Sequence, residues 1–258
     1  MTQIPTADLP GGGRMPLLGF GTWQLSGRQC YDAVRTALDA GYRHVDTATM
    51  YRNEAEVGRA LRDSGVPRDE VFVTTKLPPA RADRPEETIA ASLDALGLDR
   101  VDLWLVHWPP GDAGVDLWRR FLAVRDDGRA RDVGVSNYGL AQVDEVTRAT
   151  GERPAVNQVP WAPSRYDAAV EQGHRERGVA LEGYSPIKNT DLGAPVLHEV
   201  ADAHGVTPAQ VVLRWHLEHG VAVIPKSATP ERIAANAAIA GFSLSAEEVA
   251  RVDGLARG

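Results

Sequence analysis

Four side chains that could carry out proton transfer stand at or just after strand-like runs in the first half of the chain. They are Asp46, Tyr51, Lys76 and His107. A phenol titrates at a pH of about 10. An ammonium beside Tyr51 would stabilise the phenolate and lower that pKa, and Lys76, at the end of the next strand, is placed to do so. Asp46 would hold Lys76 charged and aimed, and His107 could donate a hydrogen bond to a substrate oxygen. The set predicts a proton donor directed at a carbonyl whose oxygen becomes an alkoxide.

Later strand-like runs also end in polar side chains. They are Ser136, Asn137, Gln158, Tyr184, Ser185, Lys226 and Ser227. Any one of them alone is more often a helix cap or a loop contact than a functional group. The carboxyl ends of the strands of a barrel meet at one rim, so the whole set favours an active site there.

Structural explanations stand beside this one. Asn53 and Glu54 are expected to cap the helix that follows Tyr51. Tyr51 alone would more often be a packed aromatic residue, and His107 alone a structural histidine. Lys76 is harder to explain in this way, because a lysine at the end of a buried β-branched run has little access to water. Taken jointly, the four side chains favour the catalytic interpretation.

The elements that must position these residues alternate along the chain. Strand-like runs are predicted at 17–23, 44–48, 71–77, 101–108, 131–137, 155–161, 180–186 and 221–227. Helical patterns are predicted at 31–41, 54–65, 86–97, 115–128, 140–151, 166–178, 208–220 and 230–241, with a further helix at 245–258. Eight strands that are each followed by a helix predict an α/β fold, the closed (β/α)8 TIM barrel.

An open doubly wound sheet is the alternative architecture. It is disfavoured because no G-x-G-x-x-G follows the first strand. The glycines at 11–13 precede that strand instead, and we predict that they form the turn of a short N-terminal β-hairpin. No linker-like segment divides the chain, so we expect one domain over residues 1–258.

Composition narrows the function classes. The chain has 258 residues, a formal net charge of −7 and one cysteine, Cys30. The acidic balance argues against general nucleic-acid binding, and the single cysteine excludes an internal disulfide and a cysteine-rich metal site. No ligand set for a metal is apparent. The first residues lack a signal pattern and no apolar run could span a bilayer, so we expect a cytoplasmic protein that does not bind membranes.

Several motifs together resemble one family. "GYRHVDTATMYRNEAEVGRAL", "TTKL", "VDLWLVHWP", "GVSNY", "VNQ", "GYSPI" and "IPKSATPERIAAN" occur in the order, and at the strand ends, typical of the aldo-keto reductases. The resemblance extends from about Leu17 to the C-terminus and is greatest to the short bacterial members. It implies a monomeric barrel that reduces small-molecule aldehydes and ketones with NADPH.

The resemblance also implies residue roles. The catalytic tetrad would be Asp46, Tyr51, Lys76 and His107, with Tyr51 as the general acid. The residues implied to contact the cofactor are Gly21, Thr22, Asp46, Ser136, Asn137, Gln158, Tyr184, Ser185, Lys226, Ser227, Thr229, Arg232 and Asn236. Within that set, Tyr184 would stack on the nicotinamide, and the stretch from Lys226 to Arg232 would bind the 2′-phosphate at a helix start.

Some positions depart from the family pattern. Ala235 replaces a glutamate that usually precedes the adenine contact, and Arg52 stands where glycine often follows the tyrosine. The segment after "HWPP" is short and little chain follows the last helix. We therefore expect an open substrate pocket, and its lining residues are predicted to be Trp23, Met50, Tyr51, Trp108 and Trp161.

Two other functions are compatible with a barrel of this kind. One is a cofactor-binding barrel with a sensing or structural role and little turnover, which an intact tetrad disfavours. The other is an aldolase in which Lys76 forms a Schiff base, which would leave the "KSATPER" segment unexplained.

Overall fold

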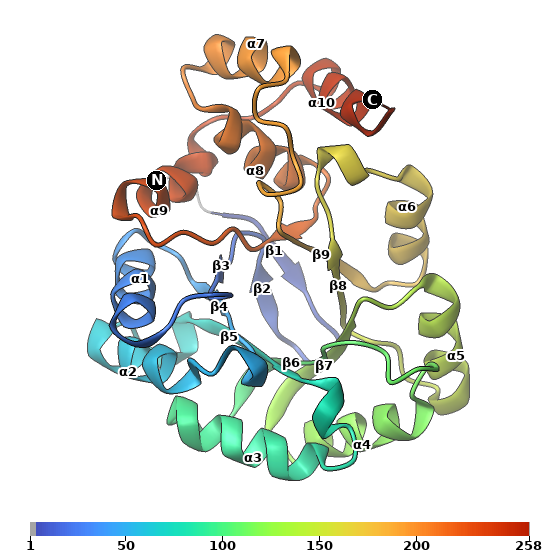
Figure 1. The fold of residues 1–258 in the computed structure, drawn as a ribbon. Coiled ribbons are helices and arrows are strands. Elements are labelled where there is room, and N and C mark those ends of the chain that lie inside the picture. Colours follow the sequence, from blue (N-terminus) through green and yellow to red (C-terminus); the bar gives the residue numbers. More distant parts are fainter. Residues whose placement is uncertain (1–3, 258) are drawn as a thin grey trace.

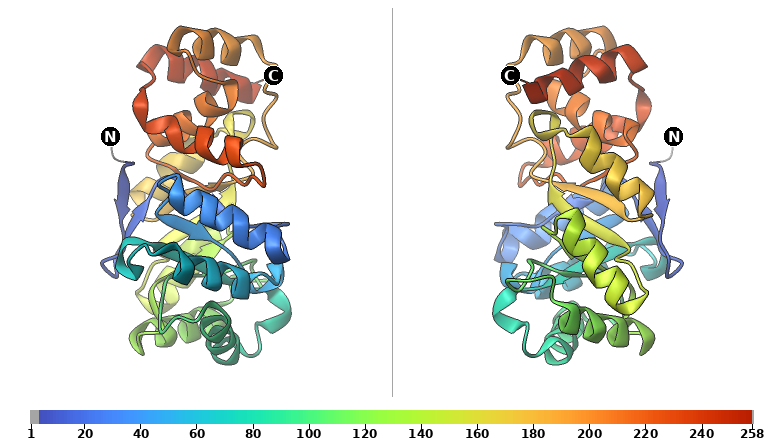
Figure 2. Two further views of the ribbon diagram at one scale, coloured as in Figure 1. Left: turned by 90° about the vertical axis from the view of Figure 1, so that its left-hand side faces the viewer. Right: turned by 90° about the vertical axis from the view of Figure 1, so that its right-hand side faces the viewer.

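The computed structural model describes residues 4–257, so residues 1–3 and 258 of the expected domain lie outside the described part. The chain begins with an antiparallel hairpin of β1 (Thr6–Asp8) and β2 (Arg14–Pro16), which lies across one end of the barrel (Figures 1 and 2). Gly12 takes a left-handed φ of 83° in its turn. The predicted hairpin is confirmed.

Eight parallel strands form the barrel in sequence order. They are β3 (Phe20–Gly21), β4 (His44–Asp46), β5 (Phe72–Leu77), β6 (Val101–Val106), β7 (Ala130–Ser136), β8 (Val156–Pro160), β9 (Ala180–Tyr184) and β10 (Ala222–Val223). Each strand lies within one of the predicted runs, except that β7 begins one residue before its run. The β-branched and aromatic residues that dominate these runs suit a sheet that is buried on both faces.

The first and last strands meet and close the barrel. Leu18 forms a parallel bridge with Val223, the Gly19 amide donates to the Val223 carbonyl at 2.9 Å, and the Val223 amide donates to the Leu17 carbonyl at 2.7 Å. We call this junction of residues 17–21 with residues 223–225 the seam. The closed barrel is therefore confirmed over the open sheet.

Helices surround the strands, as Figure 1 shows. Those at the predicted positions are α1 (Gly27–Asp39), α2 (Glu54–Ser64), α3 (Pro85–Leu96), α4 (Val115–Asp126), α5 (Leu140–Thr150), α6 (Ala168–Glu176), α8 (Pro208–Glu218), α9 (Pro230–Ala237) and α10 (Ala246–Asp253). Gly65, Gly97 and Gly151 end their helices in the left-handed conformation. Helix α7 (Pro195–His204) has no counterpart among the predicted elements.

Large aromatic side chains fill the layer between strands and helices. Trp104, Trp118 and Trp215 are almost fully buried. The Trp104 ring stacks on Phe121 at 3.8 Å between centroids. Burial of each such ring stabilises the fold by roughly 1.5–3 kcal/mol. Within residues 4–257, none of the helices combines the length and the apolar character needed to cross a bilayer.

Candidate active site

A cavity of about 450 Å³ opens at the carboxyl ends of the strands. Most of the predicted site residues line it. They are Gly21, Trp23, Asp46, Met50, Tyr51, His107, Trp108, Ser136, Asn137, Gln158, Tyr184, Ser185 and Lys226. Residues from seven of the eight βα units meet here because the strand ends share one rim, and the unit of β5 is the exception.

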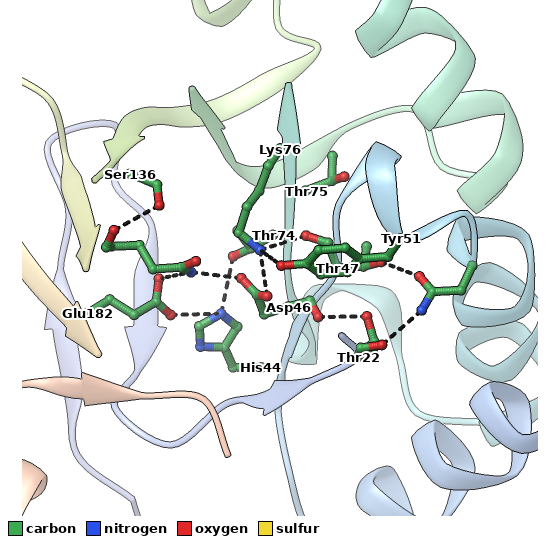
Figure 3. Close-up of polar contacts among 12 residues, drawn as sticks. Thr22, His44, Asp46, Thr47, Tyr51, Thr74, Thr75, Lys76, Ser136 and Glu182 are labelled. Atoms are coloured by element: carbon green, nitrogen blue, oxygen red, sulfur yellow. Dashed lines mark hydrogen bonds and ion pairs between the residues drawn. The ribbon is translucent and has the colours of Figure 1, made fainter. Parts of the chain in front are cut away.

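Lys76 lies beneath this cavity and is fully buried. Its ammonium donates to Asp46 Oδ1 at 2.6 Å, to the Thr47 carbonyl at 2.8 Å and to the Tyr51 hydroxyl at 3.5 Å (Figure 3). An ammonium has three donors, so each of them has an acceptor here. The sequence prediction that Asp46 holds Lys76 against Tyr51 agrees with this geometry.

A short 3-10 helix, η1 (Thr49–Tyr51), sets the phenol above Lys76. The chain then turns at Arg52, which has a left-handed backbone with φ of 57°. That conformation costs a residue with a Cβ roughly 1–2 kcal/mol. It gives a physical reason for the glycine expected at this position, while the Arg52 side chain remains without a structural explanation.

Burial and charge set the protonation states of the group. Burial raises the pKa of Tyr51, and the Lys76 ammonium only partly opposes it. The predicted net lowering of that pKa is therefore wrong. Burial by itself would lower the pKa of Lys76, but Asp46 and Tyr51 outweigh it and the pKa is raised. At neutral pH the phenol is protonated and the ammonium is charged.

His107 stands on the other side of the phenol. Its ring meets Tyr51 edge-on at 5.8 Å and stacks on Trp108 at 4.2 Å. Burial, with a smaller contribution from the Lys76 charge, lowers the pKa of His107 to about 2. The imidazole is therefore neutral, and its Nδ1 has no hydrogen-bond partner among residues 4–257.

A network of amides and hydroxyls forms the opposite wall. The Tyr184 hydroxyl donates to Asn137 Oδ1 at 2.8 Å, and Asn137 Nδ2 donates to the His107 carbonyl at 3.0 Å. Ser136 Oγ donates to the Gln158 carbonyl at 2.8 Å. Asn137 holds a left-handed φ of 64°, which an asparagine tolerates better than most residues. These contacts fix the side chains before any ligand arrives.

Comparison with known proteins identifies the family. A sequence profile of the Aldo/keto reductase family matches residues 17–257. The chain belongs to the aldo/keto reductase family. The resemblance seen in the motifs is thereby confirmed, and the family supports an oxidoreductase with carbonyl reduction as its type of reaction.

Individual relatives align over nearly the whole chain. It is 44% identical to 2,5-diketo-D-gluconic acid reductase B of Corynebacterium sp. (strain SHS752001), covering 100% of this chain and 95% of that protein. It is 37% identical to glycerol 2-dehydrogenase (NADP(+)) of Saccharomyces cerevisiae, covering 95% and 89%. A crystal structure of an aldo/keto reductase from Brucella melitensis matches with a TM-score of 0.94 at 38% identity, covering 99% of each chain.

Some predicted residues of this aldo/keto reductase lie away from the cavity. Ser227 and Thr229 lead from Lys226 into α9, Arg232 lies in its first turn and Asn236 near its end, and none of the four lines the cavity. Thr22 is fully buried, and its hydroxyl donates to the Asp46 carbonyl at 3.0 Å. Its side chain therefore supports the backbone at Asp46 and does not face the cavity.

Trp161 was predicted to line the substrate pocket, and this prediction is wrong. Only 2% of it is exposed, and it packs with Leu181 and Trp215 in a core cluster outside the barrel. Side chains alternate along a strand, so the odd spacing from Gln158 directs Trp161 to the outer face. Trp23, Met50 and Trp108 do line the cavity and are the large exposed apolar residues of the described chain.

The predicted cap at Asn53 and Glu54 is confirmed in position but not in hydrogen bonding. Asn53 is the residue before α2, but its side chain makes no cap bond. Its amide donates to the Thr22 and Leu25 carbonyls at 3.0 and 2.9 Å, which joins two loops at the rim. Glu54 is buried and accepts from the Thr75 hydroxyl at 2.6 Å.

Glu182 and His44 extend the polar interior below the site, and sequence reasoning did not assign Glu182. Both are fully buried, and burial raises the pKa of Glu182 to about 8. The two-residue repeat of a strand would have predicted it: Glu182 precedes Tyr184 by two residues, so both side chains point into the barrel. Residues 4–257 contain no group of three His, Cys, Asp or Glu arranged to hold a metal ion.

Proposed function

We propose that this protein reduces aldehydes and ketones to alcohols with NADPH, using Tyr51 as the general acid. The observation that carries the proposal is the buried Lys76–Asp46 ion pair directly below the Tyr51 hydroxyl, at the floor of the cavity. A protonated phenol beside a fixed ammonium suits the delivery of a proton to a developing alkoxide.

The residues around the cavity fit the nicotinamide end of the cofactor. Tyr184 is half-buried at the wall and offers a ring face, while Ser136, Asn137 and Gln158 offer amide and hydroxyl groups for a carboxamide. A Cβ on Gly21 would lie 3.0 Å from the Ile224 carbonyl, so glycine keeps this wall close to the strand. When bound, the nicotinamide supplies a hydride from C4 to the carbonyl carbon.

The 2′-phosphate is assigned to the start of α9. Lys226 and Arg232 are exposed, and neither has an ion-pair partner within residues 4–257. The Ser227 hydroxyl accepts from the Thr229 amide at 3.0 Å, which shapes the turn into the helix. Two cations beside a helix N-terminus favour a phosphate dianion. Asn236, one turn further, is assigned to the adenine.

The chain's own groups complete the reduction. Tyr51 donates its proton to the substrate oxygen as the carbonyl carbon gains the hydride, which gives a neutral alcohol. Lys76 stabilises the tyrosinate that remains, and Asp46 keeps Lys76 in place. Neutral His107 orients the carbonyl oxygen by donating a hydrogen bond. Water then returns a proton to Tyr51.

The apolar rim indicates the kind of substrate. Trp23, Met50 and Trp108 are between 39% and 47% exposed at the mouth. The Trp23 ring lies 4.9 Å from the Tyr51 ring, so a carbonyl held at Tyr51 would have its remaining chain against these side chains. We infer small carbonyl compounds with an apolar portion.

A Schiff base at Lys76 is disfavoured by the same geometry. Such chemistry needs a neutral, accessible amine. Lys76 is fully buried and its three donors are occupied. Burial alone would lower its pKa, but the carboxylate of Asp46 opposes burial and the pKa is raised overall. Borohydride trapping with a carbonyl substrate should leave no adduct on Lys76.

The test follows NADPH absorbance with a panel of small aldehydes and ketones. The wild type should consume NADPH, and Tyr51→Phe should lose about 10²–10⁴-fold in kcat because it lacks the proton donor. Its Kd for NADPH, measured by fluorescence titration, should stay near the wild-type value. Tight binding without turnover by the wild type would contradict the proposal and favour a sensing role.

A further inference from the structure

A cluster of buried polar side chains lies beside the Asp46–Lys76 pair, and Figure 3 shows His44, Thr74 and Glu182 around it. It consists of Glu182 on β9, Gln158 on β8, and His44 with Thr74 on β4 and β5. All four are buried in the barrel interior. The proposed proton transfer uses none of His44, Thr74 and Glu182, so their presence needs a separate explanation.

The contacts of His44 determine its tautomer. Its Nδ1 lies 3.2 Å from the Pro16 carbonyl, which can only accept, so Nδ1 carries the proton. Burial lowers the pKa of His44 to about 4, so the ring is neutral. Nε2 is then an acceptor that faces Thr74 Oγ1 at 3.1 Å and Glu182 Oε1 at 3.7 Å.

The tautomer of His44 constrains Glu182. A carboxylate oxygen opposite the lone pair of Nε2 would be repelled, whereas a protonated Oε1 would be attracted. Oε1 has no hydrogen-bond partner among residues 4–257, and Glu182 Oε2 accepts from Gln158. Geometry and burial therefore agree that Glu182 is a neutral carboxylic acid with its proton toward His44.

The position of Gln158 follows from its two carboxyl partners. Its Nε2 donates to Glu182 Oε2 at 2.8 Å and to Asp46 Oδ2 at 2.9 Å. A side-chain amide has two N–H donors, so both are used inside the barrel. The carbonyl Oε1 is the group that remains for the cavity, which Gln158 lines.

We propose that Glu182 is a positioning residue that fixes the side-chain amide of Gln158 so that its Oε1 faces the cavity as a hydrogen-bond acceptor. The ligand group that this acceptor selects is an N–H donor, here the carboxamide of the nicotinamide. This inference rests on the proposed function. It also predicts that Glu182 keeps a negative charge away from Asp46 as long as it is protonated.

The charges around Glu182 define its second effect. Asp46 and His44 face it from β4 and Lys76 from β5, while its register partner on β10 is Ala222. If Glu182 loses its proton, the Asp46–Lys76 pair gains a second anion beside it. That anion would raise the pKa of Tyr51 further and make it a weaker acid.

Two substitutions separate these effects. Glu182→Leu removes the acceptor for Gln158 at similar volume, and Glu182→Gln keeps an acceptor but cannot ionise. The control is Asn157→Leu, a buried residue of β8 that bonds Tyr138 and His174 away from the cavity. Circular dichroism and thermal unfolding establish that each variant is folded.

The first measurement compares the Kd of NADP+ with that of its 3-acetylpyridine analogue, which lacks the carboxamide N–H. The wild type should prefer NADP+ by about tenfold, the loss of one buried hydrogen bond. Glu182→Leu should lose that preference, while Glu182→Gln and Asn157→Leu should retain it. A Glu182→Leu protein that still discriminates would overturn the positioning role.

The second measurement is the pH profile of kcat/KM. In the wild type, reduction should decline above a pH of about 8 as Glu182 ionises. In Glu182→Gln that decline should be absent, which leaves only the loss of activity at the higher pH where Tyr51 titrates. An unchanged profile would overturn the charge effect even if Glu182→Leu did not fold. A wild type that binds neither NADP+ nor NADPH would instead refute the proposed function.

Discussion

Lys76 affects both the stability of the fold and the proposed proton transfer at Tyr51. A fully buried ammonium is tolerated because Asp46 lies 2.6 Å away and the Thr47 carbonyl accepts a second bond. Removal of one partner from such a pair leaves an uncompensated charge, whereas removal of both does not. The same pairing that keeps the barrel interior stable thus supports the phenol of Tyr51.

This pairing predicts a non-additive result. Lys76→Met should lower the free energy of unfolding by about 3–5 kcal/mol, because Asp46 is left buried and unpaired. The double variant Asp46→Asn with Lys76→Met should recover part of that loss. Urea unfolding monitored by tryptophan fluorescence measures both. Equal losses in the single and double variants would show that the ion pair is not the cause.

Arg232 carries a prediction about cofactor preference. Arg232→Ala should raise the KM for NADPH by about tenfold, through the loss of a charge-assisted bond to the 2′-phosphate. The KM for NADH should change little, since NADH lacks that phosphate. Steady-state kinetics with both cofactors is the measurement, and parallel increases in both KM values would refute the phosphate role.

At the residue scale the sequence predicted which side chains meet but not how burial acts on them. Asp46, Tyr51, Lys76 and His107 come together because strand ends of a parallel barrel share a rim. The pKa of Tyr51 was predicted in the wrong direction, because the depth of its burial follows from packing that the sequence does not reveal. The outward direction of Trp161 follows from the strand period alone, because its spacing from the inward-facing Gln158 is odd.

Elements were predictable where local patterns determine them. The eight strands follow β-branched runs, and Gly65, Gly97 and Gly151 mark helix ends. Helix α7 was missed although Pro195 begins it and Gly205 ends it in the left-handed conformation. The seam could not be read from local pattern, because it pairs residues from opposite ends of the chain.

The C-terminal helix α10 is held by a specific polar contact. Asp253 accepts from Trp215 Nε1 at 2.7 Å and lies 3.0 Å from His219 Nε2. His219 also lies 2.9 Å from Glu171 on α6, so it joins two helices that are distant in sequence. Docking of α10 therefore depends on Asp253.

Asp253→Ala should lower the free energy of unfolding by about 1–3 kcal/mol, because two donors lose their acceptor in a largely buried position. The matched control is Arg251→Ala, on the same helix in an exposed ion pair with Glu199. That control should change stability by less than about 1 kcal/mol. Similar losses in both variants would mean that the helix is held by something other than Asp253.

The whole molecule should respond to pH through its buried interior. Burial raises the pKa of Glu182 in the folded protein to about 8, above its ordinary value of 4.5. The stability that this group contributes is complete below a pH of 4.5 and is lost as the pH rises to about 8. Burial lowers the pKa of His44 in the folded protein from its ordinary value of 6.5 to about 4. The stability that His44 contributes is therefore complete above a pH of 6.5 and is lost as the pH falls through 4.

Between pH 4.5 and about 8, the unfolding free energy of the wild type should therefore fall by roughly 1.4 kcal/mol per pH unit relative to that of Glu182→Gln. Urea unfolding of both proteins at several pH values provides the difference. A difference that stays constant across this range would show that Glu182 is ionised in the folded protein throughout.

The seam joins the two shortest strands of the barrel, β3 and β10, which have two residues each. Short strand pairs open locally at a lower free energy than long ones. The barrel should therefore open at the seam before it opens between any other two strands. Gly21 and Lys226, on its two sides, both line the cavity. A dinucleotide that contacts both sides would bind the closed form alone and thereby slow that opening. The bound cofactor would then lower the rate of opening at the seam, and proteases would cut the free enzyme faster than the bound form.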